Sequence, residues 1–250
     1  MDRSSELPSA PPHHAPSRRL AAWKPAGMSD WPGRVSATLY LAGCSLTCPY
    51  CPSLALRSAI TDPADWDLIV SHIEERRGWL DGVVVGGGEP TEDPDLLSLL
   101  AALCDLGVAV RLDTNGTRPD VLRHVLAEGL ADHVSLDVKA LPSRYDSVAP
   151  RAGAASLVAE SVELIIRSGV DHEFRTTVHP GCVALEELPR IARSLRGGRL
   201  YVLRQIGGHE VSGPDTADVP YEDDRLRDAA SACSAYLPTI VRGLRSGVPG

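Results

Sequence analysis

Three cysteines lie close together in the segment GCSLTCPYC, residues 43–51. Cys44, Cys48 and Cys51 are separated by three and two residues, so a single loop can turn all three thiolates toward one metal centre. A structural zinc ion usually takes four protein ligands, and a cluster that only carries electrons usually takes four cysteines. Three cysteines therefore predict a metal centre that lacks its fourth protein ligand.

The other three cysteines of the chain, Cys104, Cys182 and Cys233, are scattered, and each is predicted to be a small buried hydrophobic residue. Six cysteines are too few and too unevenly spaced for a disulfide framework in 250 residues. The clustered cysteines therefore indicate metal ligands in a reducing compartment. An alternative is a structural zinc site in a protein without enzymatic function, with a histidine or Cys233 as the fourth ligand.

Lysine is rare in this chain, which uses arginine for almost all of its positive charge. The only lysines are Lys24 and Lys139. A compact ammonium group suits a point-charge contact with a carboxylate. Asp137 and Lys139 have the same side-chain parity on a strand, so Lys139 is interpreted either as a ligand-binding residue or as half of a simple ion pair.

The elements that must position these residues alternate between short β-branched segments and longer helical patterns. Strands are predicted at 35–41, 82–86, 108–114, 133–138, 172–178 and 199–206, and helices near 63–79, 94–106, 118–129, 155–168, 185–195 and 222–243. Six successive strand and helix units indicate a parallel sheet, either doubly wound or closed into an incomplete barrel. Residues 1–21 are rich in Pro and Ser and are predicted to be a disordered tail, which leaves 22–250 as one domain.

Chemically capable residues follow the predicted strands, one group after another. The cysteines follow the first strand, GGGEP (86–90) the second, DTNG (113–116) the third and DVK (137–139) the fourth, while RTTVHPG (175–181) and RQIGGHE (204–210) follow the last two. The carboxyl ends of parallel strands meet on one face, where α/β proteins build their active sites. His179 and His209 lie in these segments and are interpreted as ordinary polar loop residues.

Composition excludes several other classes of function. The net charge of -8 argues against a broad nucleic-acid-binding surface. The sequence has no apolar segment of the roughly 18 residues that a membrane helix needs, and no apolar secretory signal at the N-terminus. We therefore expect a cytoplasmic protein that binds neither membranes nor nucleic acid.

These motifs together resemble the radical S-adenosylmethionine (SAM) enzymes. The resemblance consists of C-x3-C-x2-C, the following GGEP, and the segments LDTNG, SLDVK and EFRTTVHPG. The segment KPAGMSDWPGRVSATLYLAGCSLTCPYC is similar to the start of the small activating proteins of the anaerobic ribonucleoside-triphosphate reductase, a glycyl radical enzyme. The resemblance runs from about Lys24 to about Gln205.

The resemblance implies an incomplete (β/α)6 barrel with its active site at the carboxyl ends of the strands. One [4Fe-4S] cluster would be held by Cys44, Cys48 and Cys51, and SAM would bind the fourth iron through its methionyl amine and carboxylate. Further SAM contacts are implied as follows: Gly87, Gly88 and Glu89 for the amine, Lys139 for the carboxylate, Tyr50 for the adenine, Asp113, Thr114 and Asp137 for the ribose or a monovalent cation, and Asn115 and Arg175 as additional cofactor-binding residues.

The activity implied is reductive cleavage of SAM to a 5'-deoxyadenosyl radical that abstracts hydrogen from a glycine of the partner reductase. A flavodoxin or ferredoxin-type protein would supply the electron. This chain differs from those activating proteins at Pro52-Ser53, where they have His-Asn, and at Gly86, where Ser or Thr is usual. A second enzymatic interpretation is a radical SAM enzyme that acts on a small molecule, of the type that makes a deazapurine precursor.

Overall fold

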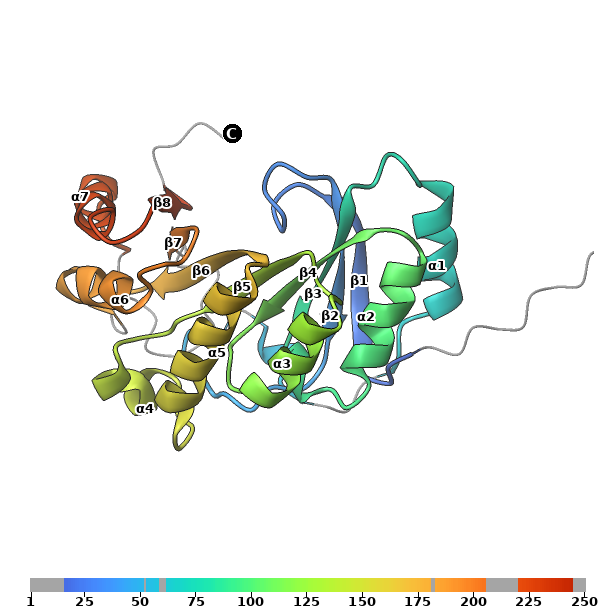
Figure 1. Ribbon diagram of the computed structural model, residues 1–250, viewed down its shortest axis with the longest axis horizontal. Helices are drawn as coiled ribbons and strands as arrows, with labels where there is room; N and C mark the ends of the chain where they lie inside the picture. Colours follow the sequence, from blue (N-terminus) through green and yellow to red (C-terminus); the bar gives the residue numbers. More distant parts are fainter. Residues whose placement is uncertain (1–15, 52, 59–61, 181–182, 206–219, 245–250) are drawn as a thin grey trace, which may run out of the picture.

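The strands form one sheet in which sequence order is also spatial order (Figure 1). The structure is a computed structural model that describes residues 16–51, 53–58, 62–180, 183–205 and 220–244. The strands are β1 Leu20–Gly27, β2 Ser36–Leu41, β3 Gly82–Gly87, β4 Ala109–Thr114, β5 His133–Asp137, β6 Asp171–Val178, β7 Tyr201–Gln205 and β8 Thr239–Arg242. β1 runs antiparallel to β2, and every later neighbour pair is parallel. Within these residues β1 and β8 are the two edges of the sheet, so the barrel is incomplete.

Helices connect the parallel strands and lie along one face of the sheet (Figure 1). They are α1 Trp66–Glu75, α2 Leu96–Asp105, α3 Pro119–Ala127, α4 Tyr145–Val148, α5 Ala154–Ser168, α6 Leu188–Ser194 and α7 Asp223–Cys233. Short 3-10 turns are η1 Leu54–Leu56, η2 Pro90–Glu92, η3 Pro142–Arg144 and η4 Leu185–Glu187. Local signals start several helices; for example, the Asp65 side chain caps α1 by accepting a hydrogen bond from the Leu68 amide.

The six predicted strands correspond to β2 through β7, and the predicted barrel is confirmed. The edge strands β1 and β8 were not predicted. β1 was missed because it contains Pro25. Proline is unusual in strands except at a sheet edge, where β1 lies. The helix predicted over 222–243 is wrong in its second half, because the helix ends at Cys233 and the segment after Pro238 forms β8.

The predicted tail, residues 1–21, lies largely outside the described residues, but its last members are packed. Leu20 is fully buried and begins β1. The Ser17 hydroxyl is also buried and donates to the carboxylate of Asp93, beyond η2. The folded part of the chain therefore includes Ser17 and Leu20, which the sequence had assigned to the tail.

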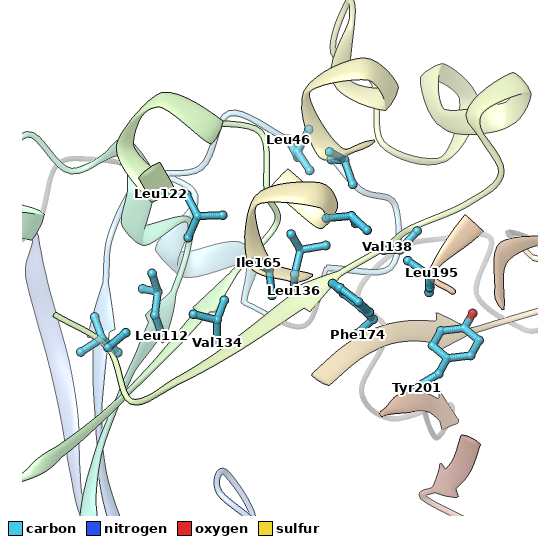
Figure 2. Packing of buried hydrophobic residues seen from close by; sticks show 14 of the residues in the cluster. Leu46, Leu112, Leu122, Val134, Leu136, Val138, Ile165, Phe174, Leu195 and Tyr201 are labelled. Atoms are coloured by element: carbon cyan, nitrogen blue, oxygen red, sulfur yellow. The ribbon is translucent and has the colours of Figure 1, made fainter. Parts of the chain in front are cut away.

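The face of the sheet under the helices is apolar. Each strand from β2 to β6 contributes a fully buried side chain to this face: Leu39, Val85, Leu112, Leu136 and Phe174, in that order. Figure 2 shows part of this layer, with Ile165 of α5 among Leu112, Val134 and Leu136. Removal of these side chains from water is the main force that holds the helices on the sheet.

The opposite, concave face of the sheet is charged. Glu173 of β6 is buried and accepts hydrogen bonds from Arg111 of β4 at 2.8 Å and from Arg242 of β8 at 3.0 Å. Ser135 of β5 donates to the same carboxylate at 3.2 Å. These contacts tie β8 to the centre of the sheet across the concave side.

The β1–β2 hairpin explains one of the two lysines. Lys24 donates to the carboxylate of Asp30, which also accepts from the Thr38 hydroxyl at 2.8 Å. Lys24 therefore fixes the hairpin and lies outside the cavity described below.

No helix among the described residues is both long enough and apolar enough to cross a membrane.

Glu173→Gln is expected to lower the free energy of unfolding by about 3 kcal/mol at pH 7, because on this face Arg242 loses its charged partner and the buried Arg111 loses one of its two, keeping Asp113. Denaturant unfolding of the metal-free protein measures this loss. The matched control is Glu160→Gln, which breaks the exposed 2.6 Å pair with Arg123 and should change stability by less than about 1 kcal/mol. Equal effects of the two substitutions would contradict the prediction.

The same carboxylate predicts a pH dependence. Burial alone would raise the pKa of Glu173, but the positive charges of Arg111 and Arg242 outweigh burial and lower this pKa from 4.5 to about 2. The stabilisation is then complete above about pH 4.5 and is lost as the pH falls toward 2. The stability difference between the wild type and Glu173→Gln should therefore shrink across this window; a constant difference would be evidence against the pair.

Candidate functional site

A cavity of about 210 Å³ opens at the carboxyl ends of the parallel strands. Its lining includes all thirteen residues that the sequence analysis singled out: Cys44, Cys48, Tyr50, Cys51, Gly87, Gly88, Glu89, Asp113, Thr114, Asn115, Asp137, Lys139 and Arg175. The parallel sheet thus brings residues from β3 to β6, and from the loops after β2 to β5, to one place.

The cysteine loop leaves β2 through Gly43, whose positive φ of 96° favours glycine. Cys48 is buried, while Cys44 and Cys51 are half-buried. The Cys51 amide donates to the Cys48 carbonyl at 3.2 Å, so the second and third cysteines lie on one tight turn. Ser53 follows and also lines the cavity, whereas Pro52 lies outside the described residues.

Gly88 allows the chain after β3 to pack directly against the cysteine loop. A Cβ atom added at Gly88 would lie 2.2 Å from the carbonyl oxygen of Gly43, and the Glu89 amide donates to that oxygen at 2.7 Å. The resemblance implied that Gly87 and Gly88 border the amine of SAM. In the structure the nearest neighbour of this backbone is the chain itself, so the glycines also set the position of Cys44.

Glu89 has a buried carboxylate that joins two of the loops. It accepts hydrogen bonds from the Thr91 amide at 3.1 Å, the Thr91 hydroxyl at 2.5 Å, the Thr114 hydroxyl at 2.6 Å and the Asn115 amide at 2.6 Å. Burial raises the pKa of Glu89, while these four donors favour its charged form. The carboxylate therefore fixes the loop after β3 to the end of β4.

Acidic and basic side chains alternate along the cavity wall formed by β4, β5 and β6. Arg175 donates to Asp137 at 2.7 Å and to Asp113 at 2.8 Å, and Lys139 donates to the second oxygen of Asp137 at 2.7 Å. Burial would raise the pKa of Asp137, but the charges of Arg175 and Lys139 outweigh it and lower that pKa. Lys139 is thus an ion-pair partner of Asp137 and also part of the cavity wall. Pairing with Asp137 therefore does not remove Lys139 from the cavity, where a ligand would lie.

Two of the cysteines have weakly acidic thiols in the absence of metal. Burial raises the pKa of Cys44 to about 11 and also raises that of Cys48. Because metals bind the thiolate, metal binding at these positions must release protons. The Asn115 side-chain amide lies 3.9 Å from the Cys44 sulfur and donates toward it.

The donor set was compared with the two metal centres that the sequence left open. Among the described residues, no three metal-ligating side chains gather around a single ion position. A mononuclear zinc site needs such convergence, whereas a four-iron cluster attaches each of three cysteines to a different iron. Three cysteines on one loop, facing a cavity with cationic side chains in its wall, fit the cluster.

Four lining residues were not predicted: Leu46, Ser53, Thr177 and Arg204. Thr177 and Arg204 are paired in register on β6 and β7 and share the parity of Arg175, a signal that was present in the sequence. Arg204 is exposed and, among the described residues, makes no ion pair.

Of the residues expected to be uninvolved, those that the structure describes do not line the cavity. Cys233 is fully buried in the core, as predicted, and Cys104 of α2 is half-buried. His179 is buried and does not line the cavity. Cys182 and His209 lie outside the described residues.

Comparison with known proteins agrees with this geometry. The sequence model of the radical SAM superfamily matches residues 39–208. A Methanocaldococcus jannaschii protein provisionally named as a glycyl-radical enzyme activating enzyme is 27% identical over 218 residues, which cover 85% of this chain and 90% of that protein. The 7-carboxy-7-deazaguanine synthase of Methanopyrus kandleri is 32% identical over 138 residues, which cover 47% of this chain and 54% of that enzyme.

Among solved structures, the fold is similar to that of Streptococcus suis SuiB bound to S-adenosylmethionine. The TM-score is 0.61 at 15% identity, over 81% of this chain and 48% of SuiB. This chain therefore spans about half the length of SuiB, and the likeness concerns the fold. With a family match over more than half of its residues, the chain belongs to the radical SAM superfamily, whose enzymes use a [4Fe-4S] cluster and SAM as cofactors.

Proposed function

We propose that this chain activates a glycyl radical enzyme, and that the partner is an anaerobic ribonucleoside-triphosphate reductase. The observation that carries the proposal is the extent of the match with the activating relative, which covers 85% of this chain and 90% of the relative. The deazaguanine synthase match covers 47% of this chain.

In this proposal each cavity residue has a specific task. Cys44, Cys48 and Cys51 bind three irons of the cluster and leave the fourth to SAM. The Lys139 ammonium group binds the SAM carboxylate, and its 2.7 Å contact with Asp137 keeps it charged and oriented. The buried Tyr50 packs against the adenine.

The other polar residues hold SAM in register. The backbone of Gly87 and Gly88, together with Glu89, borders the methionyl amine. Asp113, Thr114 and Asp137 hold the ribose or a monovalent cation, with Asn115 and Arg175 beside them. The mutual contacts of Asp113, Asp137 and Arg175 support this, because they fix the wall before any ligand arrives.

When bound, the cluster and SAM would supply one-electron reductive cleavage of SAM and, from it, the abstraction of a hydrogen atom from the target glycine. The chain's own task is to exclude water, for which the buried side chains of Leu46 and Tyr50 are suited. Arg204 lines the cavity and is itself exposed, and in this proposal the target glycine loop enters beside it. A flavodoxin or ferredoxin-type protein supplies the electron.

A second candidate is a radical SAM enzyme for a small anionic molecule of the deazapurine-precursor type. The exposed Arg204 favours it, because a cavity-lining guanidinium without an acidic partner in the described residues can bind a substrate carboxylate. The partial likeness to a 7-carboxy-7-deazaguanine synthase points the same way.

Anaerobic reconstitution is expected to load about four irons per chain with a broad brown absorption, and Cys48→Ala should lose both, because each cysteine binds one iron of the cluster. Iron analysis and visible spectroscopy measure this. Cys104→Ala, which removes a cysteine of α2 outside the cavity, should load like the wild type. Stoichiometric zinc without iron would contradict the cluster.

Lys139→Ala is expected to weaken SAM binding about tenfold or more while iron content stays unchanged, because the lost contact is a charge-assisted hydrogen bond to a carboxylate. Equilibrium binding of SAM to the reconstituted protein gives the affinity. Lys24→Ala removes the other lysine, which pairs with Asp30 in the β1–β2 hairpin, and should bind SAM normally. Parallel loss of iron and SAM binding in Lys139→Ala would make Lys139 structural.

The reduced, cluster-loaded protein, incubated with SAM and the anaerobic reductase of the same organism, is expected to produce a glycyl radical doublet in electron spin resonance. The Cys48→Ala variant should produce none. SAM cleavage that occurs normally, but leaves no radical on the reductase, would reject the proposed partner and favour the small-molecule candidate.

A further inference from the structure

Asn115 is oriented by its neighbours so that its amide nitrogen points at the Cys44 sulfur. Its side-chain oxygen accepts from the Thr117 amide at 2.9 Å and from the Thr117 hydroxyl at 2.8 Å. With the oxygen occupied, the NH2 group is directed toward Cys44, 3.9 Å away, a reach that suits the large radius of sulfur. The side chain is buried, so water competes little for this contact.

Thr117 is in turn held by Arg151, from the loop before α5. The Arg151 terminal nitrogen Nη1 donates to the Thr117 hydroxyl at 2.8 Å and to the Glu92 carboxylate at 2.8 Å. The same nitrogen is also within hydrogen-bonding distance of the hydroxyl of Ser45, the residue after Cys44, and because it carries two hydrogens, one of them is shared between two of the three acceptors. Because the Thr117 hydroxyl accepts from Arg151, its own hydrogen is free for the Asn115 oxygen. The hydrogen bonds therefore run in one direction, from Arg151 through Thr117 and Asn115 to the sulfur.

Such a chain of hydrogen bonds has a definite electrostatic consequence for an iron-bound cysteine. The sulfur becomes more negative when the cluster takes up an electron, so a donor to it stabilises the reduced state more than the oxidised state. A guanidinium at the start of the chain polarises each following donor in the same sense.

We propose that Asn115 raises the reduction potential of the cluster by donating to the Cys44 sulfur, and that Thr117 and Arg151 are positioning residues for it. The proposal rests on the proposed role of Cys44 as a cluster ligand. It adds a redox role to Asn115, and it brings in Thr117, Arg151 and Ser45, which lie outside the cavity lining.

The test is a redox titration of the reconstituted protein without SAM, followed by the electron spin resonance signal of the reduced cluster. Asn115→Ala is expected to lower the ratio of reduced to oxidised cluster at a fixed potential about fivefold, which is about 40 mV for a one-electron couple. Thr117→Val should shift the potential in the same direction by a smaller amount, because the Asn115 oxygen keeps its bond from the backbone amide of residue 117 and loses only the hydroxyl donor with its link to Arg151. Thr117→Ser, which keeps the hydroxyl, should behave like the wild type.

Arg151→Gln should also lower the potential. Its matched control is Arg118→Gln, which removes the same charge from beside Glu92 without touching Thr117, and should have a smaller effect. Unchanged potentials in Asn115→Ala and Thr117→Val with full iron content would overturn the proposal. If Asn115→Ala fails to hold iron, the pair Thr117→Val and Thr117→Ser decides the question.

Failure of the underlying assignment would look different. If Cys44→Ala retained the wild-type cluster, Cys44 would not be a ligand, and both the proposed role of Cys44 and this inference would fall. If Cys44→Ala loses iron while the Asn115 and Thr117 variants keep the wild-type potential, the assignment of Cys44 stands and the redox inference fails.

Discussion

The close contact between the Gly43 and Gly88 backbones, locked by the buried carboxylate of Glu89, is the constraint on which the site depends. The glycines bring the loop after β3 within hydrogen-bonding distance of the cysteine loop. Glu89 then ties that loop to Thr114 and Asn115 at the end of β4. A side chain at Gly88 would meet backbone rather than a movable group, so the loops would have to separate. The placement of Cys44 therefore rests on backbone contact.

The concave face gives the site its second property, a fixed arrangement of charge. Within the described residues, contacts run from Arg242 through Glu173, Arg111, Asp113, Arg175 and Asp137 to Lys139. Each carboxylate lies between two cations, and each of the three arginines and the one lysine in the row is held by a neighbouring acid. An array of this kind resists rearrangement when a charged cofactor binds, because moving one group leaves its neighbours unpaired in a poorly solvated place. The polar lining is thus a preorganised surface, while the apolar face under the helices stabilises the fold.

Much of this was readable in the sequence because parallel α/β architecture converts order along the chain into position in space. Once GGGEP, DTNG and DVK are assigned to successive strand ends, their convergence follows from topology. Prediction failed where a signal was weak or contradictory. Pro25 argued against a strand at β1. The helical pattern before Pro238 led to a predicted helix that ran on through the short β8. Thr177 and Arg204 carried the right parity but lacked a motif that distinguished them from ordinary strand residues.

The sequence by itself determined the ligand chemistry, the order of the strands and the set of residues at their carboxyl ends, because spacing and side-chain parity are local properties. Only the tertiary structure decided which partner each residue has. It joined Lys24 to Asp30 and Lys139 to Asp137, although the two lysines are equally rare in the sequence. It also brought Arg151 to Thr117 across 34 residues. The physical reason is that a hydrogen bond depends on distance and direction between atoms, and both are set by the packing of loops far apart in the chain.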